Sequence, residues 1–275
     1  MRSKVLATCT LAVASLVGPH RASADLIGFG NGNGYSLNYS PGFDTTGPTI
    51  ANNTLSLTDN TNLEARSVFA TTRQVITRFE AHFQYQATPY ASSAGFGDGL
   101  TFTIQNAPAG ARAVGNSGGG LGYEGITSSV AVELNLFSLY KVGTFLGVNG
   151  TTGASQGGYL PTGSVSLIAG DPIGVDLFYD GTALRETLTD LTTRASFQTS
   201  YAINIAAIVG GTTAYVGFTG GTGLATANQT ISNFTMVVPE PASLPLLAVG
   251  GLMIAGAKAG RRLSPARPGS PGRGR

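Results

Sequence analysis

The chain has almost no cysteine or histidine and no tryptophan, and each shortage removes a class of chemistry. Its only cysteine is Cys9, and its two histidines are His20 and His82, among 275 residues. Cys9 and His20 lie in the first 24 residues, which have the pattern of a cleaved export signal. A mature chain without cysteine has no disulfide, thiolate nucleophile or cysteine-ligated metal. His82 alone is a poor basis for a Ser-His-Asp hydrolase or a histidine-rich metal enzyme, and its alternating context predicts a surface position on a strand.

Charged residues are also scarce, at 11% of the chain against roughly 25% in ordinary soluble domains. The formal net charge is +2, but the cations are concentrated at the two ends of the chain. Between Asp25 and Val238, seven Lys and Arg residues face thirteen Asp and Glu residues, so this body carries a net charge of −6. A weakly acidic body lacks the basic patch that nucleic-acid binding requires. No nucleic-acid partner is expected.

The first 24 residues predict an export signal. Arg2 and Lys4 precede an apolar run over residues 5–17, and Ala22-Ser23-Ala24 has the small-x-small pattern that signal peptidase cleaves. The apolar run is shorter than the roughly 20 residues of a membrane span, which favours cleavage over anchoring. We therefore expect a signal helix in residues 1–24 and a mature chain that begins at Asp25.

Residues 25–238 predict one all-β domain. Gly, Thr, Ser and Asn are frequent, apolar residues alternate in short runs, and no long stretch repeats every 3.6 residues. Turn signals such as residues 179–182 and 220–223 separate these runs. No linker rich in Pro and Ser divides the body, which favours a single two-sheet antiparallel sandwich. The expected strands are Gln74–Gln84, Leu100–Gln105, Val130–Phe137, Ile173–Tyr179, Leu184–Thr189, Thr213–Thr219 and Gln229–Val237.

Residues 239–262 form a different kind of segment. Pro239-Glu240-Pro241 precedes a short apolar stretch over residues 244–257, which is followed by three Lys and Arg residues. This pattern resembles the PEP-CTERM sorting signal of Gram-negative bacteria, and the resemblance implies a short transmembrane helix, recognition by an exosortase-type enzyme and processing of the tail. A plain C-terminal anchor with its cations on the cytoplasmic side is the alternative. Residues 263–275 are rich in Pro, Gly and Arg, and we expect a disordered basic tail there.

Asp98 is the first candidate binding residue. It lies in the run Gly97-Asp98-Gly99-Leu100-Thr101-Phe102, at the start of a predicted strand. Glycines on both sides let a ligand approach the backbone closely. A carboxylate in that position is a good hydrogen-bond acceptor for two vicinal hydroxyl groups.

Two further segments follow Asp98 along the chain. One is the glycine loop Gly118-Gly119-Gly120-Leu121-Gly122-Tyr123, and the other is the strand-like run Val130-Ala131-Val132-Glu133-Leu134-Asn135-Leu136-Phe137. Side chains alternate between the two faces of a strand. Glu133, Asn135 and Phe137 therefore share one face, and Val130, Val132, Leu134 and Leu136 share the other.

These three segments resemble, in the same order, motifs of the L-type, legume-like lectins: an Asp-Gly-Leu-x-Phe strand, a Gly-Gly-x-Leu-Gly loop and a Val-Ala-Val-Glu-Phe-Asp strand. The resemblance covers roughly Asp25–Val237 and is to a bacterial member of the family. Residues 179–223 resemble the family's C-terminal half, which ends in a glycine-rich loop near the sugar site. It implies a concanavalin-like jelly roll, a cis peptide before Asp98 and sugar binding. In the absence of Trp, stacking on a sugar is left to Phe137, Tyr140 or Phe145. The candidate carbohydrate-binding residues are Asp98, Gly119, Gly120, Asn135 and Phe137.

The resemblance also implies a metal site on the third segment, for which this chain supplies Glu133 and Asn135. Without gaps, the family's further ligand positions fall on Leu139, Thr144 and Asn149, none of which is a carboxylate. Calcium takes six to eight oxygen ligands with sufficient negative charge. A Ca/Mn pair is therefore not expected, and a single Ca is the one cofactor left open.

The sequence as a whole predicts an exported, non-catalytic glycan-binding protein of the cell surface or exopolysaccharide matrix, transiently anchored in the membrane of a Gram-negative bacterium. One alternative is a structural matrix protein that keeps the lectin fold without a working sugar site. The other is a glycoside hydrolase, which needs two carboxylates about 5.5 Å apart for a retaining reaction. Hydrolases that share this fold resemble Glu-x-Asp-x-Glu on one strand face, where this chain has Glu133, Asn135 and Phe137. We therefore expect no enzyme; the sugar and the oligomeric state are not specified by the sequence.

Overall fold

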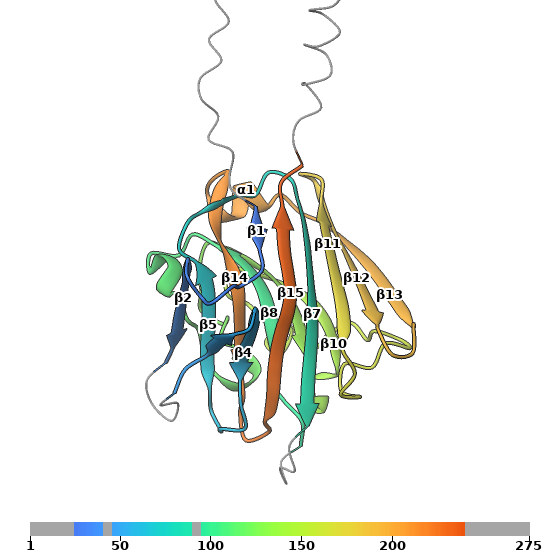
Figure 1. Ribbon diagram of the computed structural model, residues 1–275. Coiled ribbons are helices and arrows are strands. Elements are labelled where there is room, and N and C mark those ends of the chain that lie inside the picture. The colour runs from blue at the N-terminus through green and yellow to red at the C-terminus, as the bar shows by residue number, and fades with distance from the viewer. Residues whose placement is uncertain (1–24, 41–45, 90–94, 240–275) are drawn as a thin grey trace, which may run out of the picture. The chain divides into compact units, whose positions relative to one another are not determined.

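Two antiparallel β-sheets make up most of the regular structure in the computed structural model, which describes residues 25–40, 46–89 and 95–239 (Figure 1). The first sheet has eight strands, and its shortest strand, β1 (Leu26–Ile27), pairs with β15 beside the main path. Along that path the order is β13 (Ser196–Ala202), β12 (Ala183–Asp190), β11 (Ile173–Tyr179), β7 (Phe79–Pro89), β15 (Ala227–Val237), β4 (Thr54–Thr58) and β3 (Thr49–Ala51).

The second sheet has seven strands, and β6 (Gln74–Val75) pairs with β14 beside its main path. The main order is β10 (Gly143–Val148), β9 (Ser129–Asn135), β8 (Gly99–Gln105), β14 (Thr213–Gly221), β5 (Ala65–Ala70) and β2 (Tyr35–Tyr39). Short helical turns connect some of the strands. They are the α-helix α1 (Ile205–Val209) and the 3-10 helices η1 (Gly110–Arg112), η2 (Gly118–Gly120) and η3 (Ser138–Tyr140).

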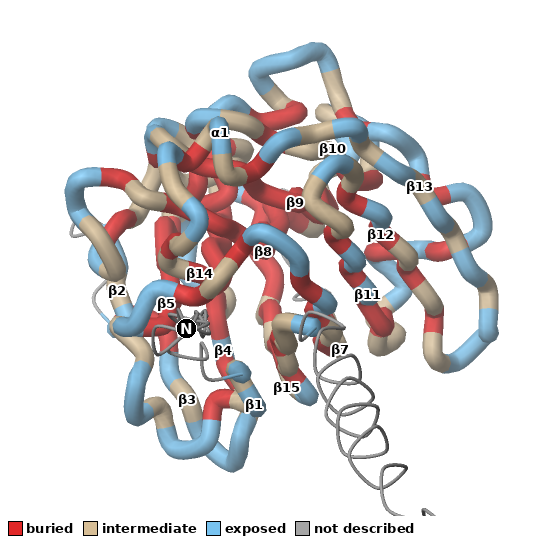
Figure 2. The backbone as a smooth tube through the Cα atoms, turned by 90° about the horizontal axis from the view of Figure 1, so that it is seen from above, coloured by how far each residue is buried: buried red, intermediate tan, exposed pale blue. Residues whose placement is uncertain are grey.

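The core lies between the two sheets and is built by the alternation that the sequence shows. On β9, the side chains of Val130, Val132 and Leu134 enter the main hydrophobic core, as does Leu136 just after the strand. An aromatic cluster crosses between the layers, where Phe83 of the eight-stranded sheet packs edge-on against Phe218 of the seven-stranded sheet at 5.0 Å between ring centroids. Burying each such ring contributes roughly 1.5–3 kcal/mol. Figure 2 shows the buried stretches running along the strands of both layers.

The predicted all-β, two-sheet antiparallel sandwich is confirmed. The strand predicted at Ile173–Tyr179 has the same bounds in the structure, and five other predicted strands differ by one or two residues at one or both ends. The strand predicted at Gln74–Gln84 is instead two strands, β6 and β7, because the chain changes sheets between Val75 and Phe79. Strands β1 to β5, β10 and β13 were not among the predicted strands.

The predicted signal helix at 1–24 and the predicted segments beyond Pro239 lie outside the described residues. Within the ranges that the structure describes, no helix is both long and apolar enough to cross a membrane.

Strand pairing places the three sequence segments at one end of the sandwich. Gly99, the first residue of β8, pairs with Gly221 at the end of β14 and with Asn135 at the end of β9. The two ends of the described chain lie at the opposite end, where Leu26 pairs with Met236 near the end of β15. Figure 1 shows both terminal strands reaching that same end.

Candidate functional site

Asp98 is fixed by its backbone between the ends of two neighbouring strands. The Gly97–Asp98 peptide bond is cis, as the family resemblance implied. The Asp98 N–H donates to the carbonyl oxygen of Gly221 at 3.2 Å, and the Asp98 carbonyl accepts from the N–H of Leu136 at 2.7 Å. These two bonds tie the aspartate to the end of β14 and to the residue that follows β9.

The Asp98 carboxylate is buried against glycine backbone. Only 3% of the residue is exposed, and Oδ2 accepts no hydrogen bond within the described part of the chain. A Cβ atom added at Gly223 would lie 2.9 Å from Oδ2, and one added at Gly118 would lie 3.9 Å from it. Burial raises the pKa of Asp98 to about 6. The nearby Gly223 N–H opposes this rise, although it donates its own hydrogen bond to the carbonyl oxygen of Ala225 at 3.1 Å. Asp98 Oδ2 is thus a hydrogen-bond acceptor without a donor among the described residues, beside two residues, Gly118 and Gly223, that have no side chain.

The glycine loop reaches Asp98 through Gly118 rather than through the two glycines that the sequence singled out. Gly118 donates its N–H to the carbonyl oxygen of Thr222 at 2.9 Å, which holds η2 beside the 220–223 loop. Gly119 instead faces the ring of Tyr140, and Gly120 is buried. The missing side chain of Gly120 points toward Asn116 and Glu124. Gly118 is first in the run of three, and nothing in the run itself distinguishes it.

Two aromatic side chains stand between Gly97 and Gly119. A Cβ atom added at Gly97 would lie 3.3 Å from the Cβ of Phe137, and one added at Gly119 would lie 2.9 Å from the ring of Tyr140. The two rings are 5.8 Å apart between centroids and meet edge to face at 71°. Both residues are half-buried. Phe145, the third stacking candidate from the sequence, pairs instead with Tyr159 at 6.1 Å between centroids.

Glu133 lies fully buried under a cover of backbone and one tyrosine. Its Oε2 accepts from the Tyr159 hydroxyl at 3.0 Å and from the Gly153 N–H at 3.1 Å, and its Oε1 lies against Gly147. Burial raises the pKa of Glu133 to about 8. The sequence reasoning did not find Tyr159, whose own pKa is raised by burial and by the charges of Glu133 and Asp98. No spacing rule connects it to Glu133, which precedes it by 26 residues.

Asn135 is fully buried, and its side-chain amide is used inside the protein. Its Nδ2 donates to the carbonyl oxygens of Phe137 at 2.9 Å and of Lys141 at 2.8 Å. Its Oδ1 accepts from the Phe137 N–H at 3.4 Å. The side chain predicted to hydrogen-bond a sugar therefore organises the loop that carries Phe137.

The residues proposed for a metal do not fit calcium as the structure arranges them. Glu133 already accepts from Tyr159 and Gly153 through Oε2, and its Oε1 is packed against Gly147. Asn135 directs an amide N–H2 group at the nearby carbonyls. Within the described ranges, no three His, Cys, Asp or Glu side chains converge as ligands. Calcium requires several anionic or carbonyl oxygens directed at one point.

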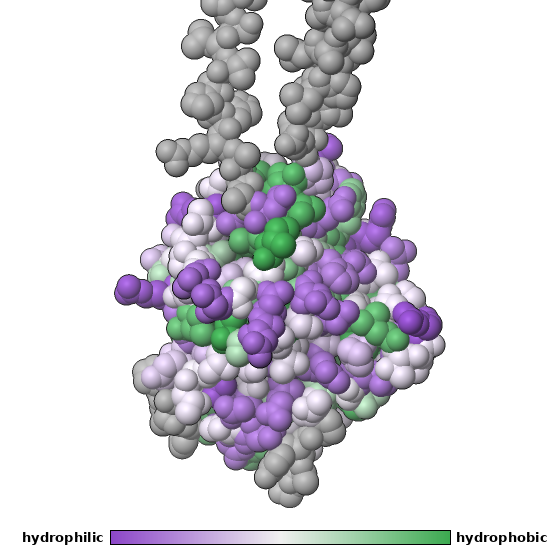
Figure 3. Space-filling view, viewed as in Figure 1, coloured by the Kyte–Doolittle hydropathy of each residue, from purple (hydrophilic) through white to green (hydrophobic). Residues whose placement is uncertain are grey.

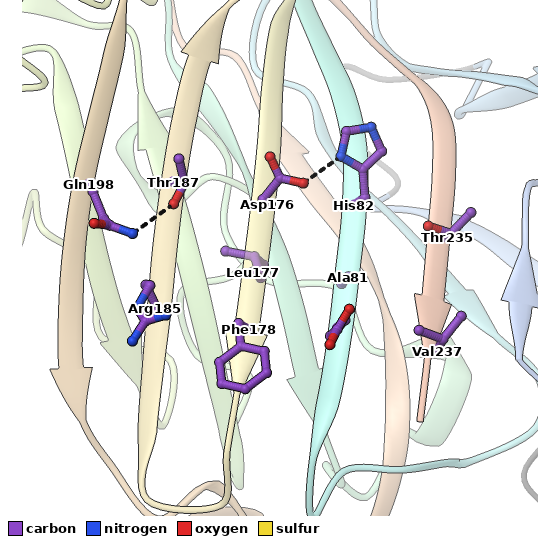
Figure 4. A pocket seen from close by; sticks show the side chains of 11 residues that line it. Ala81, His82, Asp176, Leu177, Phe178, Arg185, Thr187, Gln198, Thr235 and Val237 are labelled. Atoms are coloured by element: carbon purple, nitrogen blue, oxygen red, sulfur yellow. Dashed lines mark hydrogen bonds and ion pairs between the residues drawn. The ribbon is translucent and has the colours of Figure 1, made fainter. Parts of the chain in front are cut away.

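A hollow of about 400 Å³ lies on the outer face of the eight-stranded sheet, away from Asp98 and the other candidate site residues. In it, His82 Nδ1 and Asp176 Oδ1 are 2.8 Å apart, and Gln198 donates to Thr187 at 3.2 Å (Figure 4). The position of His82 on the outer face of β7 agrees with the predicted surface placement. Figure 3 shows this face as mostly hydrophilic or neutral, with hydrophobic residues in separate small patches.

The two-sheet fold, together with the loops around Asp98 at one end of the sandwich, defines a lectin-type β-sandwich protein. Residues 36–244 match the model of the legume lectin domain. The chain therefore belongs to the legume lectin family.

Solved structures of legume lectins and a lectin-like protein share this fold. Arcelin-5, a lectin-like defence protein from Phaseolus vulgaris, is 16% identical with a TM-score of 0.60, covering 78% of this chain and 96% of its own. The seed lectin of Lotus tetragonolobus is 17% identical at a TM-score of 0.62, covering 80% and 100%. The lectin of Bauhinia forficata, solved in complex with GalNAc, is 19% identical at a TM-score of 0.60, covering 78% and 96%. No curated protein sequence matches this chain.

Proposed function

We propose that this protein is an exported, non-catalytic glycan-binding protein whose sugar site is formed by Asp98, Gly118, Gly223 and the aromatic pair Phe137 and Tyr140. The glycan is a neutral or weakly polar one at the cell surface or in an exopolysaccharide matrix. Membership of the legume lectin family supports this proposal. So does the complex of the Bauhinia forficata lectin with GalNAc, a protein with the same fold.

The observation that carries the proposal is the unfilled Oδ2 atom of Asp98. A buried acceptor without a hydrogen bond costs roughly 1–3 kcal/mol, and a sugar hydroxyl that donates to Oδ2 removes this cost. Hydrogen bonds to an ionised carboxylate are also stronger than those between neutral groups. Only 3% of Asp98 is exposed, and the neighbouring Gly118 and Gly223 have no side chains to cover Oδ2, so we place the approach of the hydroxyl there.

The aromatic pair supplies the second part of the site. Phe137 and Tyr140 are half-buried, and each lies against a glycine at the edge of the site. Their rings present apolar surface to the C–H face of a sugar, while Asp98 accepts from its hydroxyl groups. Together the two features favour a ligand with one apolar face and vicinal hydroxyls.

The proposal does not include catalysis. Glycoside hydrolysis needs two carboxylates on either side of the scissile bond. On the outer side of β9 the chain has the single carboxyl of Glu133, which is fully buried and bonded to Tyr159 and Gly153. The Glu133 carboxyl therefore stabilises the loop of residues 153–159 and is not accessible to a substrate.

A glycan array with the mature chain tests the binding site. Wild type is expected to bind a defined set of glycans, and Asp98→Asn is expected to weaken that binding about 10- to 100-fold, the value of one hydrogen bond to a charged group. Asp176→Asn is the matched control, because its carboxylate lies on the outer face of the other sheet and is 59% exposed. Equal binding by wild type and Asp98→Asn would refute the site.

Export and surface attachment are part of the same proposal. The support is in the sequence: a small-x-small motif that ends at Ala24 and a Pro-Glu-Pro motif at residues 239–241. Expression in a Gram-negative host followed by intact-mass measurement tests the first step. The expected product begins at Asp25 and is found outside the cytoplasm; an uncleaved cytoplasmic chain would contradict export.

A structural matrix protein without a sugar site is the second candidate. The 3% exposure of Asp98 favours it, because a ligand has little carboxylate surface to contact. A folded mature chain that binds no glycan on a broad array, including polysaccharides from its own matrix, would support this candidate over the first.

A further inference from the structure

We infer that this lectin domain works without a metal, because the amide of Asn135 holds the loop beside the sugar site in the way that a cation would otherwise hold it. The role of this loop in sugar binding rests on the proposed sugar site. The independence of the fold from calcium rests only on the contacts of Asn135. It concerns the loop from Phe137 to Lys141, which contains η3.

The loop closes on the Asn135 side chain. The carbonyl oxygens of Phe137 and Lys141 both point at Nδ2, at 2.9 and 2.8 Å. An amide nitrogen carries two hydrogens, so each carbonyl receives one of them. The two carbonyls that accept from the Asn135 amide are thus matched to a neutral N–H2 donor without any added charge.

The carbonyl of Phe137 has no further capacity. Besides the Asn135 amide, it accepts the N–H of Tyr140 at 3.2 Å, within the turn of η3. A carbonyl oxygen has two lone pairs, and both are used. A calcium ion at this point would have to displace at least one of these hydrogen bonds, and it would meet the N–H2 group of Asn135 in place of an oxygen ligand.

The same contacts connect the amide to the candidate sugar site. Asn135 is the register partner of Gly99 on β8 and of Gly143 on β10, so its backbone is fixed between two neighbouring strands. The loop that it closes carries Phe137 and Tyr140, the aromatic pair of the site. Leu136, between Asn135 and this loop, donates to the carbonyl oxygen of Asp98 at 2.7 Å. An ordered Asn135 therefore positions both the aromatic pair and the aspartate.

Calcium titration of the full mature chain gives the direct test. In isothermal titration calorimetry with CaCl2 and with MnCl2, no binding is expected below millimolar concentration, and EDTA is expected to change the melting temperature by less than about 1 °C. Saturable micromolar binding of either metal, or a melting temperature that falls in EDTA, would overturn the inference. These measurements use no glycan, so they are independent of the proposed sugar site.

Replacement of the amide by a carboxylate tests the role of Asn135. Asn135→Asp removes both N–H donors at constant size and is expected to lower the melting temperature by about 5–10 °C and to weaken glycan binding at least tenfold. The matched control is Asn106→Asp, because the Asn106 amide also donates to two backbone carbonyls, those of Val209 and Thr213, but lies at the other end of β8. The control is expected to lower the melting temperature and to leave glycan affinity unchanged. An Asn135→Asp variant as stable as wild type in EDTA would show that the amide does not hold the loop.

Discussion

The guanidinium of Arg66 lies 2.6 Å from the carboxyl of Glu64, and both side chains are buried. Arg66 also pairs with Asp59 at 3.0 Å. Burial raises the pKa of Glu64 to about 9. Burial also opposes ionisation of Asp59, but hydrogen bonds with Thr61, Glu64 and Arg66 lower its pKa to about 2. The cluster therefore holds one cation, one anion and one protonated carboxyl at neutral pH, which leaves it without net charge.

This cluster supports the loop that faces Asp98. The N–H of Glu64 donates to Thr222 Oγ1 at 2.9 Å, and the N–H of Thr222 donates back to the Glu64 carbonyl at 3.1 Å. We predict that Arg66→Met lowers the free energy of unfolding by roughly 1–3 kcal/mol, since it leaves the buried carboxyl of Glu64 without its arginine partner. Urea denaturation measures the change. Arg185→Met, at an exposed position, is the control and is expected to stay within about 1 kcal/mol of wild type.

A methyl group at position 223 is predicted to block the sugar site. The added Cβ of Gly223→Ala would lie 2.9 Å from Asp98 Oδ2, so the side chain would occupy the approach to the acceptor. Glycan affinity is expected to fall at least tenfold. Gly211→Ala is the control, because its nearest contacts, to Thr213 and Asn106, are 3.6 Å or longer and lie at the other end of β14. Unchanged affinity of Gly223→Ala in calorimetry would place the sugar elsewhere.

Glycan binding is predicted to weaken as the pH falls through about 6. Burial raises the pKa of Asp98 to about 6, so the carboxylate accepts hydrogen bonds fully above this pH and becomes protonated below it. Affinity measured at pH 7.5 and pH 5 is expected to differ about tenfold in wild type. Asp98→Asn is expected to bind weakly at both values without this difference. Equal wild-type affinity at the two pH values would contradict a role for the ionised carboxylate.

The stability of the fold is predicted to decrease as the pH rises through neutrality. Glu186 is buried between the sheets, where Thr144 and Tyr201 donate to it. Burial raises its pKa from 4.5 to about 7, despite these two hydrogen bonds. A raised native pKa means that the folded state binds the proton more tightly, so this stabilisation is complete below about 4.5 and is lost as the pH passes 7.

Glu186→Gln isolates that effect. The shift corresponds to about 3 kcal/mol at most, so urea unfolding at pH 5 and pH 8 is expected to show a smaller loss of stability in Glu186→Gln than in wild type. Glu80→Gln, at an exposed position on β7, is expected to keep the wild-type difference. An equal pH dependence in Glu186→Gln and wild type would exclude Glu186 as its source.

The strands that could be predicted from the sequence are those in which apolar and polar residues alternate over a continuous run. The alternation of Val130 to Phe137 predicted that Val130, Val132, Leu134 and Leu136 share one face, and this face enters the core. The bounds of β11 were predicted correctly. Strands β1 to β4 were not predicted because each has only two to five residues, too few for a clear alternation. Strand β5 has six residues, but its polar Arg66 and Ser67 are buried, so its sequence does not alternate with burial. Strand β13, at a sheet edge, has every second residue exposed and none fully buried, so it lacks an apolar signal.

The site was predictable only in part, for a related reason. Asp98 was found because its flanking glycines are adjacent in sequence. The glycine-rich loop that ends at Gly223, 125 residues further along the chain, was expected near the sugar site only through the family resemblance. Tyr159 was not expected, because loop packing alone brings it there, 61 residues beyond Asp98. The difference between Gly118 and its two neighbours depends on the direction in which each backbone position faces, and a run of identical residues carries no information about that direction.

The pairing of β1 with the end of β15 determines at which end of the domain the protein can be attached to a support. The Val238 N–H donates to the Asp25 side chain at 3.3 Å, so the described chain enters and leaves the domain at one place. β15 has eleven residues, and its rise of about 3.3 Å per residue puts that place roughly 35 Å from the end that holds Asp98. A support attached at Asp25 or Val238 therefore lies at the end of the domain opposite Asp98, so immobilisation at these positions should leave glycan binding unobstructed.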